Sequence, residues 1–152
     1  MKENINESSI IFMLGGDTLE QIKNINSYEL KENIINNKIV IGISAGSINM
    51  AKKVVLAADP DDNIEKLSIY EGLGITNINI EPHCDFFNKI HWKDLEIASS
   101  INEIVVMNDD AYIIADEKIT YYGKYIILKD KKIYYNNELI TLKYFVENIL
   151  ND

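Results

Sequence analysis

The chain has 152 residues, 47% hydrophobic and 26% charged, with a formal net charge of −9 and a pI of about 4.7. This length and composition suit a globular protein with one domain over residues 1–152, and they argue against disorder. The negative charge repels phosphate backbones, and no apolar run is long enough to span a membrane or to form a signal core, so we expect a cytoplasmic protein with no nucleic-acid or membrane partner.

The first third of the chain alternates predicted strands and helices. Apolar runs at 9–14 (SIIFML) and 38–43 (KIVIGI) predict buried strands. Helices are predicted at 17–25, 28–37 and 45–51. Ser27 is the predicted N-cap of the second of these helices. This strand–helix order implies a parallel sheet with covering helices.

The remaining chain is richer in strands. The alternation at 75–81 (ITNINIE) predicts a strand, and a helix is expected at 92–100. Further strands are predicted at 54–58, 103–107, 111–115, 118–122, 125–128 and 132–135, and a last helix at 142–150. The expected fold class is therefore α/β, with a mostly parallel sheet flanked by helices and an antiparallel C-terminal meander.

The strongest chemical signal is Gly42-Ile43-Ser44-Ala45-Gly46, a match to G-x-S-x-G between a predicted strand and a predicted helix. A sharp turn there would hold the hydroxyl of Ser44 above the strand end, and the flanking glycines leave room for it. The helix N-terminus adds free N–H groups, so the N–H of Ala45 is expected to stabilise an oxyanion. The alternative is that Ser44 only caps the helix.

A serine nucleophile needs a base, and the chain has two histidines. His83 follows the predicted strand at 75–81, at a strand end where open α/β sheets collect their active sites. His91, just before a predicted helix, is expected to cap that helix or to face solvent, so we favour His83. With these histidines and the single Cys84, no metal site is expected. The orienting carboxylate stays open among Asp59, Asp61, Asp62, Asp85, Asp109 and Asp110.

A second turn, Gly15-Gly16-Asp17-Thr18, closes the first predicted strand and opens a helix. The backbone N–H groups of such a glycine pair could bind an anion and form the second half of an oxyanion hole. The alternative is a tight turn in which Asp17 or Thr18 caps the helix.

Taken together, the GGDT turn, the GISAGS segment, the ADP tripeptide and the EGLG…INIEPH segment resemble the dipeptidase E and cyanophycinase family of serine peptidases. The resemblance covers nearly the whole chain and implies a class I glutamine amidotransferase-like, flavodoxin-like fold. The catalytic residues that it implies are Ser44 as nucleophile, His83 as base and Asp59 as acid. Gly16 and Ala45 would donate to the oxyanion, and a further acid falls near Asp110.

Members of this family carry a further segment before the GG(N/D)T strand, whereas here that strand begins almost at the first residue. The resemblance therefore implies an N-terminally truncated sheet with an exposed apolar edge or helix face. We expect a homodimer or a partner chain to cover it, or a marginally stable protein.

The implied function is hydrolysis of short peptides, including aspartyl dipeptides, through an acyl-enzyme on Ser44 and without a metal or organic cofactor. Lys52, Lys53 and Lys89 are the basic residues considered for binding a substrate aspartate. Two alternatives stay open. The chain could be a catalytically inactive family member that acts as a binding or interaction module, or an esterase or amidase for small molecules.

Overall fold

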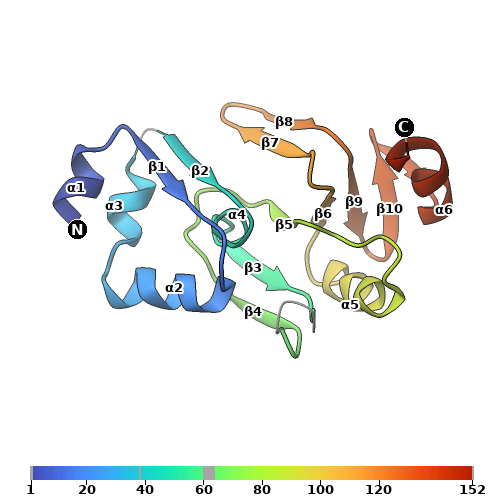
Figure 1. Cartoon of the computed structure of the whole chain (residues 1–152), viewed down its shortest axis with the longest axis horizontal. Helices are drawn as coiled ribbons and strands as arrows, with labels where there is room; N and C mark the ends of the chain where they lie inside the picture. Colours follow the sequence, from blue (N-terminus) through green and yellow to red (C-terminus); the bar gives the residue numbers. More distant parts are fainter. Residues whose placement is uncertain (1, 38, 60–63, 152) are drawn as a thin grey trace. The chain divides into compact units, whose positions relative to one another are not determined.

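The computed structural model describes residues 2–37, 39–59 and 64–151, which form two compact units (Figure 1). The first unit consists of Met1–Val54 and Tyr70–Asn77, and the second of Val55–Ile69 and Ile78–Asp152. The boundaries between the units fall within strand β3 (Lys53–Leu56), within β4 (Ser68–Glu71) and between Asn77 and Ile78. β3 and β4 pair with each other. The expectation of one domain over residues 1–152 stays a prediction.

Two parallel strands form the centre of the first unit. β1 (Ile10–Met13) pairs in parallel with β2 (Ile39–Gly42), as the strand–helix order predicted. The prediction that both strands are buried is wrong, because every second side chain along each of them is exposed. The helices of this unit are α1 (Lys2–Glu7), α2 (Thr18–Ser27), α3 (Lys31–Ile35) and α4 (Ala45–Ile48). Its buried core consists of Met13, Ile25, Leu30, Ile34 and Leu73. The opposite face of the strand pair is exposed and apolar, with Ile10, Phe12, Leu14, Ile39, Ile41 and Ile43.

The helix predicted at 28–37 begins later in the structure, where it is α3. Ser27 is the last residue of α2 and not an N-cap, so that prediction is wrong. The chain turns at Glu29, which has a φ of 51°, and α3 starts beyond it. The reason is packing: Leu30 and Ile34 are both buried, and a helix that starts here keeps them on one face. The cap of α2 is Asp17, whose side chain accepts from the N–H of Glu20 at 2.8 Å.

The second unit is built on a five-stranded sheet in the order β11-β10-β9-β6-β5. These strands are β5 (Asn79–Glu81), β6 (Ile104–Met107), β9 (Tyr125–Lys129), β10 (Lys132–Tyr135) and β11 (Glu138–Ile140). β6 lies between β5 and β9 and is buried along its whole length, in agreement with its unbroken apolar sequence IVVM. An antiparallel hairpin, β7 (Tyr112–Ala115) and β8 (Ile119–Tyr122), follows β6.

In the described part of the second unit the helical segments are α5 (Lys89–Ser99), α6 (Leu142–Phe145) and the π-helical turn η2 (Val146–Leu150). Leu95 of α5 and Phe145 of α6 are fully buried and belong to the same core as Val106, Ile126 and Leu128 of the sheet. In the parts of the chain that the structure describes, no helix has the length and apolar character needed to cross a bilayer.

The α/β fold class and the antiparallel C-terminal meander are confirmed, although antiparallel pairing has a larger share than the sequence suggested. Among the strand pairings whose register is described, β1–β2 and β5–β6 are parallel, and the others are antiparallel. The strand expected at 75–81 is shorter because its first residues bond elsewhere. The N–H groups of Ile75 and Thr76 both donate to the carbonyl of Met50, at 3.0 and 3.1 Å.

Candidate active site

Ser44 stands at the junction of β2 and α4 in a strained backbone conformation, with φ 51° and ψ −119°. Residues other than glycine rarely adopt a positive φ, and such strain gathers at functional sites. Within the described part of the chain, the Ser44 side chain makes no capping hydrogen bond to α4. Its carbonyl accepts from the N–H and the Oγ of Ser47, at 2.9 and 2.6 Å, which fixes the turn. Helix capping therefore does not explain this serine.

Both glycines of the G-x-S-x-G motif are required by close packing around the turn. A Cβ on Gly42 would lie 2.6 Å from the Cα of Ser47 and 2.6 Å from the sulfur of Met50. A Cβ on Gly46 would overlap the backbone carbonyl of Met13, the last residue of β1. The absence of side chains at both positions lets α4 approach the strands, and this holds the turn that carries Ser44.

The predicted oxyanion residues lie in the same unit as the serine. A Cβ added to Gly15 would be 3.3 Å from the Cβ of Ser44, so the glycine pair borders the serine directly. Gly16 has a φ of 133°, and no described atom lies within 4 Å of the position that its Cβ would take. Ala45 is the first residue of α4, so its N–H belongs to the donors that a helix leaves without an internal acceptor.

His83 lies in the second unit, just beyond the end of β5, and is exposed. Its Nδ1 is 2.6 Å from Oδ1 of Asp109, which lies just beyond the end of β6. β5 and β6 are parallel neighbours, so their carboxyl ends meet at one edge of the sheet and bring the two side chains together. The carboxylate in contact with His83 is therefore Asp109, one of the six candidates.

The other candidate acids have different surroundings. Oδ1 of Asp110 accepts from the N–H of Lys124 at 3.2 Å and from the side chain of Asn108 at 3.3 Å, which ties the two ends of the β7–β8 hairpin. Oδ1 of Asp85 accepts from the N–H of Phe87 at 2.9 Å. Asp61 and Asp62 lie outside the described residues. Asp59 contacts the other histidine, His91.

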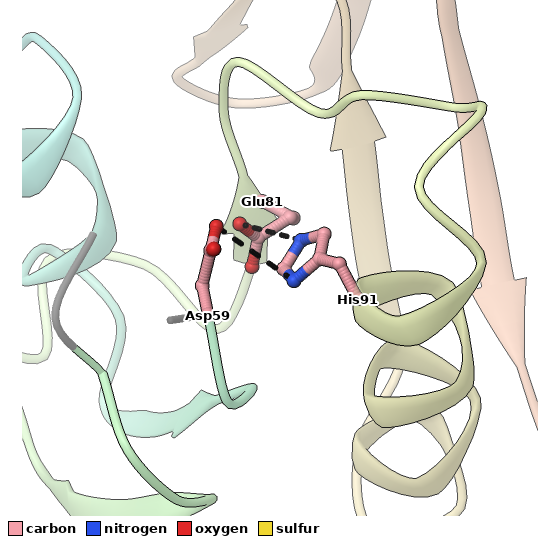
Figure 2. A group of neighbouring side chains, drawn as sticks. All are labelled: Asp59, Glu81 and His91. Atoms are coloured by element: carbon pink, nitrogen blue, oxygen red, sulfur yellow. Dashed lines mark ion pairs between the residues drawn. The ribbon is translucent and has the colours of Figure 1, made fainter. Parts of the chain in front are cut away.

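His91 is not exposed and does not cap a helix, so the expectation for it is wrong. It lies in the first turn of α5 and is only 3% exposed, whereas the cap is Asn88. Its Nδ1 is 3.1 Å from the carbonyl oxygen of Ala58. Nδ1 also lies 3.7 Å from Oδ2 of Asp59, and Nε2 lies 3.4 Å from Oε1 of Glu81 (Figure 2). The first turn of a helix is usually exposed to solvent, but the side of α5 that carries His91 is buried.

The charges around His91 favour its protonated form. Burial alone lowers the pKa of His91, but its interaction with Glu81, the carbonyl of Ala58 and the charge of Asp59 outweigh burial and raise this pKa to about 9. Sequence reasoning missed this cluster. One signal was available, because Asn79 and Glu81 alternate on a predicted strand and share one face, which the structure shows to be buried.

A serine on a strained strand–helix turn, and a histidine–aspartate pair at the ends of parallel strands, are features of α/β hydrolytic enzymes. The sequence pattern of peptidase family S51 matches residues 1–122, and the chain belongs to this family of peptidases. The family resemblance seen in the sequence is thereby confirmed.

Two solved structures have a similar fold. One is a putative peptidase E protein from Listeria monocytogenes EGD-e, with a TM-score of 0.61 and 18% identity over 80% of this chain. The other is a peptidase from an acI-B1 Actinobacterium, with a TM-score of 0.62 and 19% identity over 92% of this chain. The match spans 62% of the length of each of these proteins. Comparison with curated proteins finds no match.

Proposed function

We propose that this chain is a serine peptidase that hydrolyses short peptides through an acyl-enzyme on Ser44. The observation that carries the proposal is the backbone of Ser44, with φ 51° and ψ −119° at a turn where its side chain caps nothing in the described structure. A strained serine between a strand and a helix is the pattern of a nucleophile elbow. Membership of peptidase family S51 supports the same class of reaction.

In this mechanism Oγ of Ser44 attacks the peptide carbonyl, and Nε2 of His83 takes its proton and later gives it to the leaving amine. The mechanism requires these two atoms to come within hydrogen-bond distance in the active protein. The N–H groups of Gly16 and Ala45 stabilise the oxyanion, each by roughly 3 kcal/mol.

We assign the role of orienting acid to Asp109 in place of Asp59. The support is the 2.6 Å contact between Oδ1 of Asp109 and Nδ1 of His83, whereas Asp59 contacts His91. A carboxylate at Nδ1 keeps the proton on that nitrogen and leaves Nε2 free to act as the base. The hydrogen bonds of Asp110 to the hairpin give it a structural role in this proposal.

An activity-based probe tests the assignment of the nucleophile. We expect a fluorophosphonate to label the protein at Ser44, the label to vanish in Ser44→Ala, and labelling to persist in Ser100→Ala, a matched change at an exposed serine. Folded wild-type protein that takes up no label would overturn the proposal and indicate a binding module.

The substrate class is tested with matched panels of dipeptides and simple esters. A peptidase cleaves the dipeptides, and a preference for N-terminal aspartate would indicate a basic residue in the substrate site. Lys52, Lys53 and Lys89 are all exposed, and substitution of each by Gln compares them as candidates. Cleavage of esters alone would contradict the proposal.

The assembly is also a proposal. A second copy of the chain, bound at the exposed apolar face of β1 and β2, would remove the large side chains of this face from water. Native mass spectrometry should then give twice the mass of the chain, and Phe12→Glu, in the middle of this face, should give the monomer mass. A wild-type monomer would exclude the homodimer.

A further inference from the structure

Three polar side chains meet at a buried point in the second unit, and each comes from a different segment (Figure 2). Asp59 follows β3, Glu81 ends β5, and His91 lies in the first turn of α5. One nitrogen or oxygen atom from each residue lies within 4.8 Å of the others. His91 is 3% and Glu81 8% exposed, and the side chain of Asp59 is 17% exposed.

The hydrogen bond at Nδ1 fixes the tautomer of His91. The carbonyl of Ala58, 3.1 Å from Nδ1, can only accept, so Nδ1 carries a proton. In the neutral imidazole the lone pair is then on Nε2, which faces Oε1 of Glu81 at 3.4 Å. Among the described residues this buried Nε2 has no hydrogen-bond partner. Two electron-rich atoms in this position repel each other unless a positive charge lies between them.

The distance between Nε2 of His91 and Oε1 of Glu81 suits a metal ion better than a proton, whereas Oδ2 of Asp59 lies 3.7 Å from the other ring nitrogen, Nδ1. An N–H···O hydrogen bond measures about 2.7–3.2 Å, and the 3.4 Å between Nε2 of His91 and Oε1 of Glu81 is longer. Two ligand atoms bound to one tetrahedral Zn²⁺ at about 2.0–2.2 Å lie roughly 3.4 Å apart. A histidine that binds metal through one nitrogen usually donates its other N–H to a carbonyl or carboxylate, as His91 does to Ala58.

We propose that Nε2 of His91 and the carboxylates of Asp59 and Glu81 bind one divalent transition-metal ion of the Zn²⁺ or Mn²⁺ class. One imidazole and two carboxylates suit these ions, whereas Mg²⁺ prefers a shell of oxygen atoms alone. Three protein ligands leave a fourth position for water. The site is separate from the proposed chemistry of Ser44, and either proposal can fail without the other.

Such an ion would tie three segments of the second unit together. It would join the segment after β3 to the end of β5 and the start of α5. Glu81 is two residues before His83, so the ion would also hold the strand end from which the proposed base extends.

Direct binding measurements on the full chain test this site. After removal of metal with EDTA and dialysis, we expect Zn²⁺ to bind with a stoichiometry of one in calorimetric titration, Mn²⁺ to bind the same site more weakly, and Mg²⁺ to compete poorly. Glu81→Gln and Asp59→Asn keep the side-chain shape, and each should weaken Zn²⁺ binding by about 100-fold or more.

The second histidine–aspartate pair of the chain provides matched controls. His83→Gln and Asp109→Asn remove an exposed imidazole–carboxylate contact, and each should leave Zn²⁺ affinity within about twofold of wild type. Equal loss of binding in these controls and in Glu81→Gln would overturn the proposal, and so would wild-type protein that binds neither Zn²⁺ nor Mn²⁺.

X-ray absorption of the Zn²⁺-loaded wild type decides the case even if a variant fails to fold. We expect one imidazole and otherwise oxygen ligands at about 2.0–2.2 Å. A sulfur shell near 2.3 Å would place the ion on Cys84, the single cysteine, and would contradict the proposed ligands.

Discussion

Nδ1 of His83 lies 2.6 Å from Oδ1 of Asp109, a contact between residues that are 26 positions apart in the chain. It arises because β5 and β6 are parallel neighbours and each residue follows the end of one of them. Both side chains are exposed, with 57% and 77% of their side-chain surface accessible, so the contact serves orientation more than stability. The same contact in a serine peptidase determines which nitrogen of the base is free.

The first prediction therefore concerns Asp109. Asp109→Asn should lower kcat for dipeptide hydrolysis by about 10³–10⁴-fold, because an amide can stabilise the wrong tautomer of His83. The free energy of unfolding should change by less than about 1 kcal/mol. Steady-state kinetics and urea unfolding measure the two effects. Asp85→Asn is the control, since its side-chain oxygen can still accept from Phe87. A larger loss of kcat in Asp59→Asn than in Asp109→Asn would instead support Asp59, the acid that the family resemblance implies.

Gly15 tests the space beside the proposed nucleophile. The Cβ of Gly15→Ala would lie 3.3 Å from the Cβ of Ser44 and 3.7 Å from its Oγ, a tight contact with a side chain. We expect labelling by a fluorophosphonate to slow by roughly tenfold or more while stability changes by about 1 kcal/mol at most. Parallel measurements of labelling rate and thermal unfolding separate the two effects. An unchanged labelling rate would contradict this arrangement.

Gly46 tests packing instead of chemistry. A methyl group there would overlap the carbonyl of Met13, and backbone atoms cannot move aside as a flexible side chain can. Gly46→Ala should therefore lower the free energy of unfolding by roughly 3 kcal/mol or more, or prevent folding. Chemical denaturation followed by circular dichroism measures the change. Gly15→Ala is the comparison, and similar stabilities of the two variants would show that α4 can shift away from β1.

His91 should make stability depend on pH in metal-free protein. Its pKa is raised from an ordinary 6.5 to about 9 in the folded protein, so the folded state binds the proton more tightly than the unfolded chain. This stabilisation is fully present below about pH 6.5 and is lost as the pH rises through 9. The shift corresponds to a contribution on the order of 3 kcal/mol.

Urea unfolding in EDTA at pH 6 and pH 9.5, on wild type and His91→Gln, measures this dependence. The stability difference between the two proteins should shrink as the pH rises. His83→Gln is the control for an exposed histidine. A difference between wild type and His91→Gln that is the same at both pH values would rule out the proton as the source of the stabilisation.

Strands could be predicted from the sequence where a segment has a clear run of apolar residues. β1 and β2 lie within the apolar runs at 9–14 and 38–43, although one face of each strand is exposed and not buried as predicted, and the IVVM segment forms the buried strand β6. The prediction for Ser27 was wrong because a capping residue type is common within helices, and only the burial of Leu30 shows where the next helix begins. The β4 strand was missed because its short segment, SIYE, carries little periodic signal.

In the candidate site, the features that depend on local sequence could be predicted, and those that depend on contacts between distant segments could not. The serine turn is local, so the motif and its flanking glycines predicted its position, and the strand-end rule placed His83. The partner of each histidine was not predictable, because pairing depends on contacts between distant segments. His91 meets carboxylates 32 and 10 positions away, and no local pattern distinguishes Asp59 from its acidic neighbours.

The discontinuous first unit constrains the order in which the protein can mature during synthesis. Its last strip, Tyr70–Asn77, leaves the ribosome only after Val55–Ile69, a stretch that belongs to the other unit. When the first unit folds during synthesis, Val55–Ile69 is therefore already present, but the later residues of the second unit that it packs against are not. Early translation products that end near residue 54 lack the buried Leu73 and should be held by chaperones rather than folded.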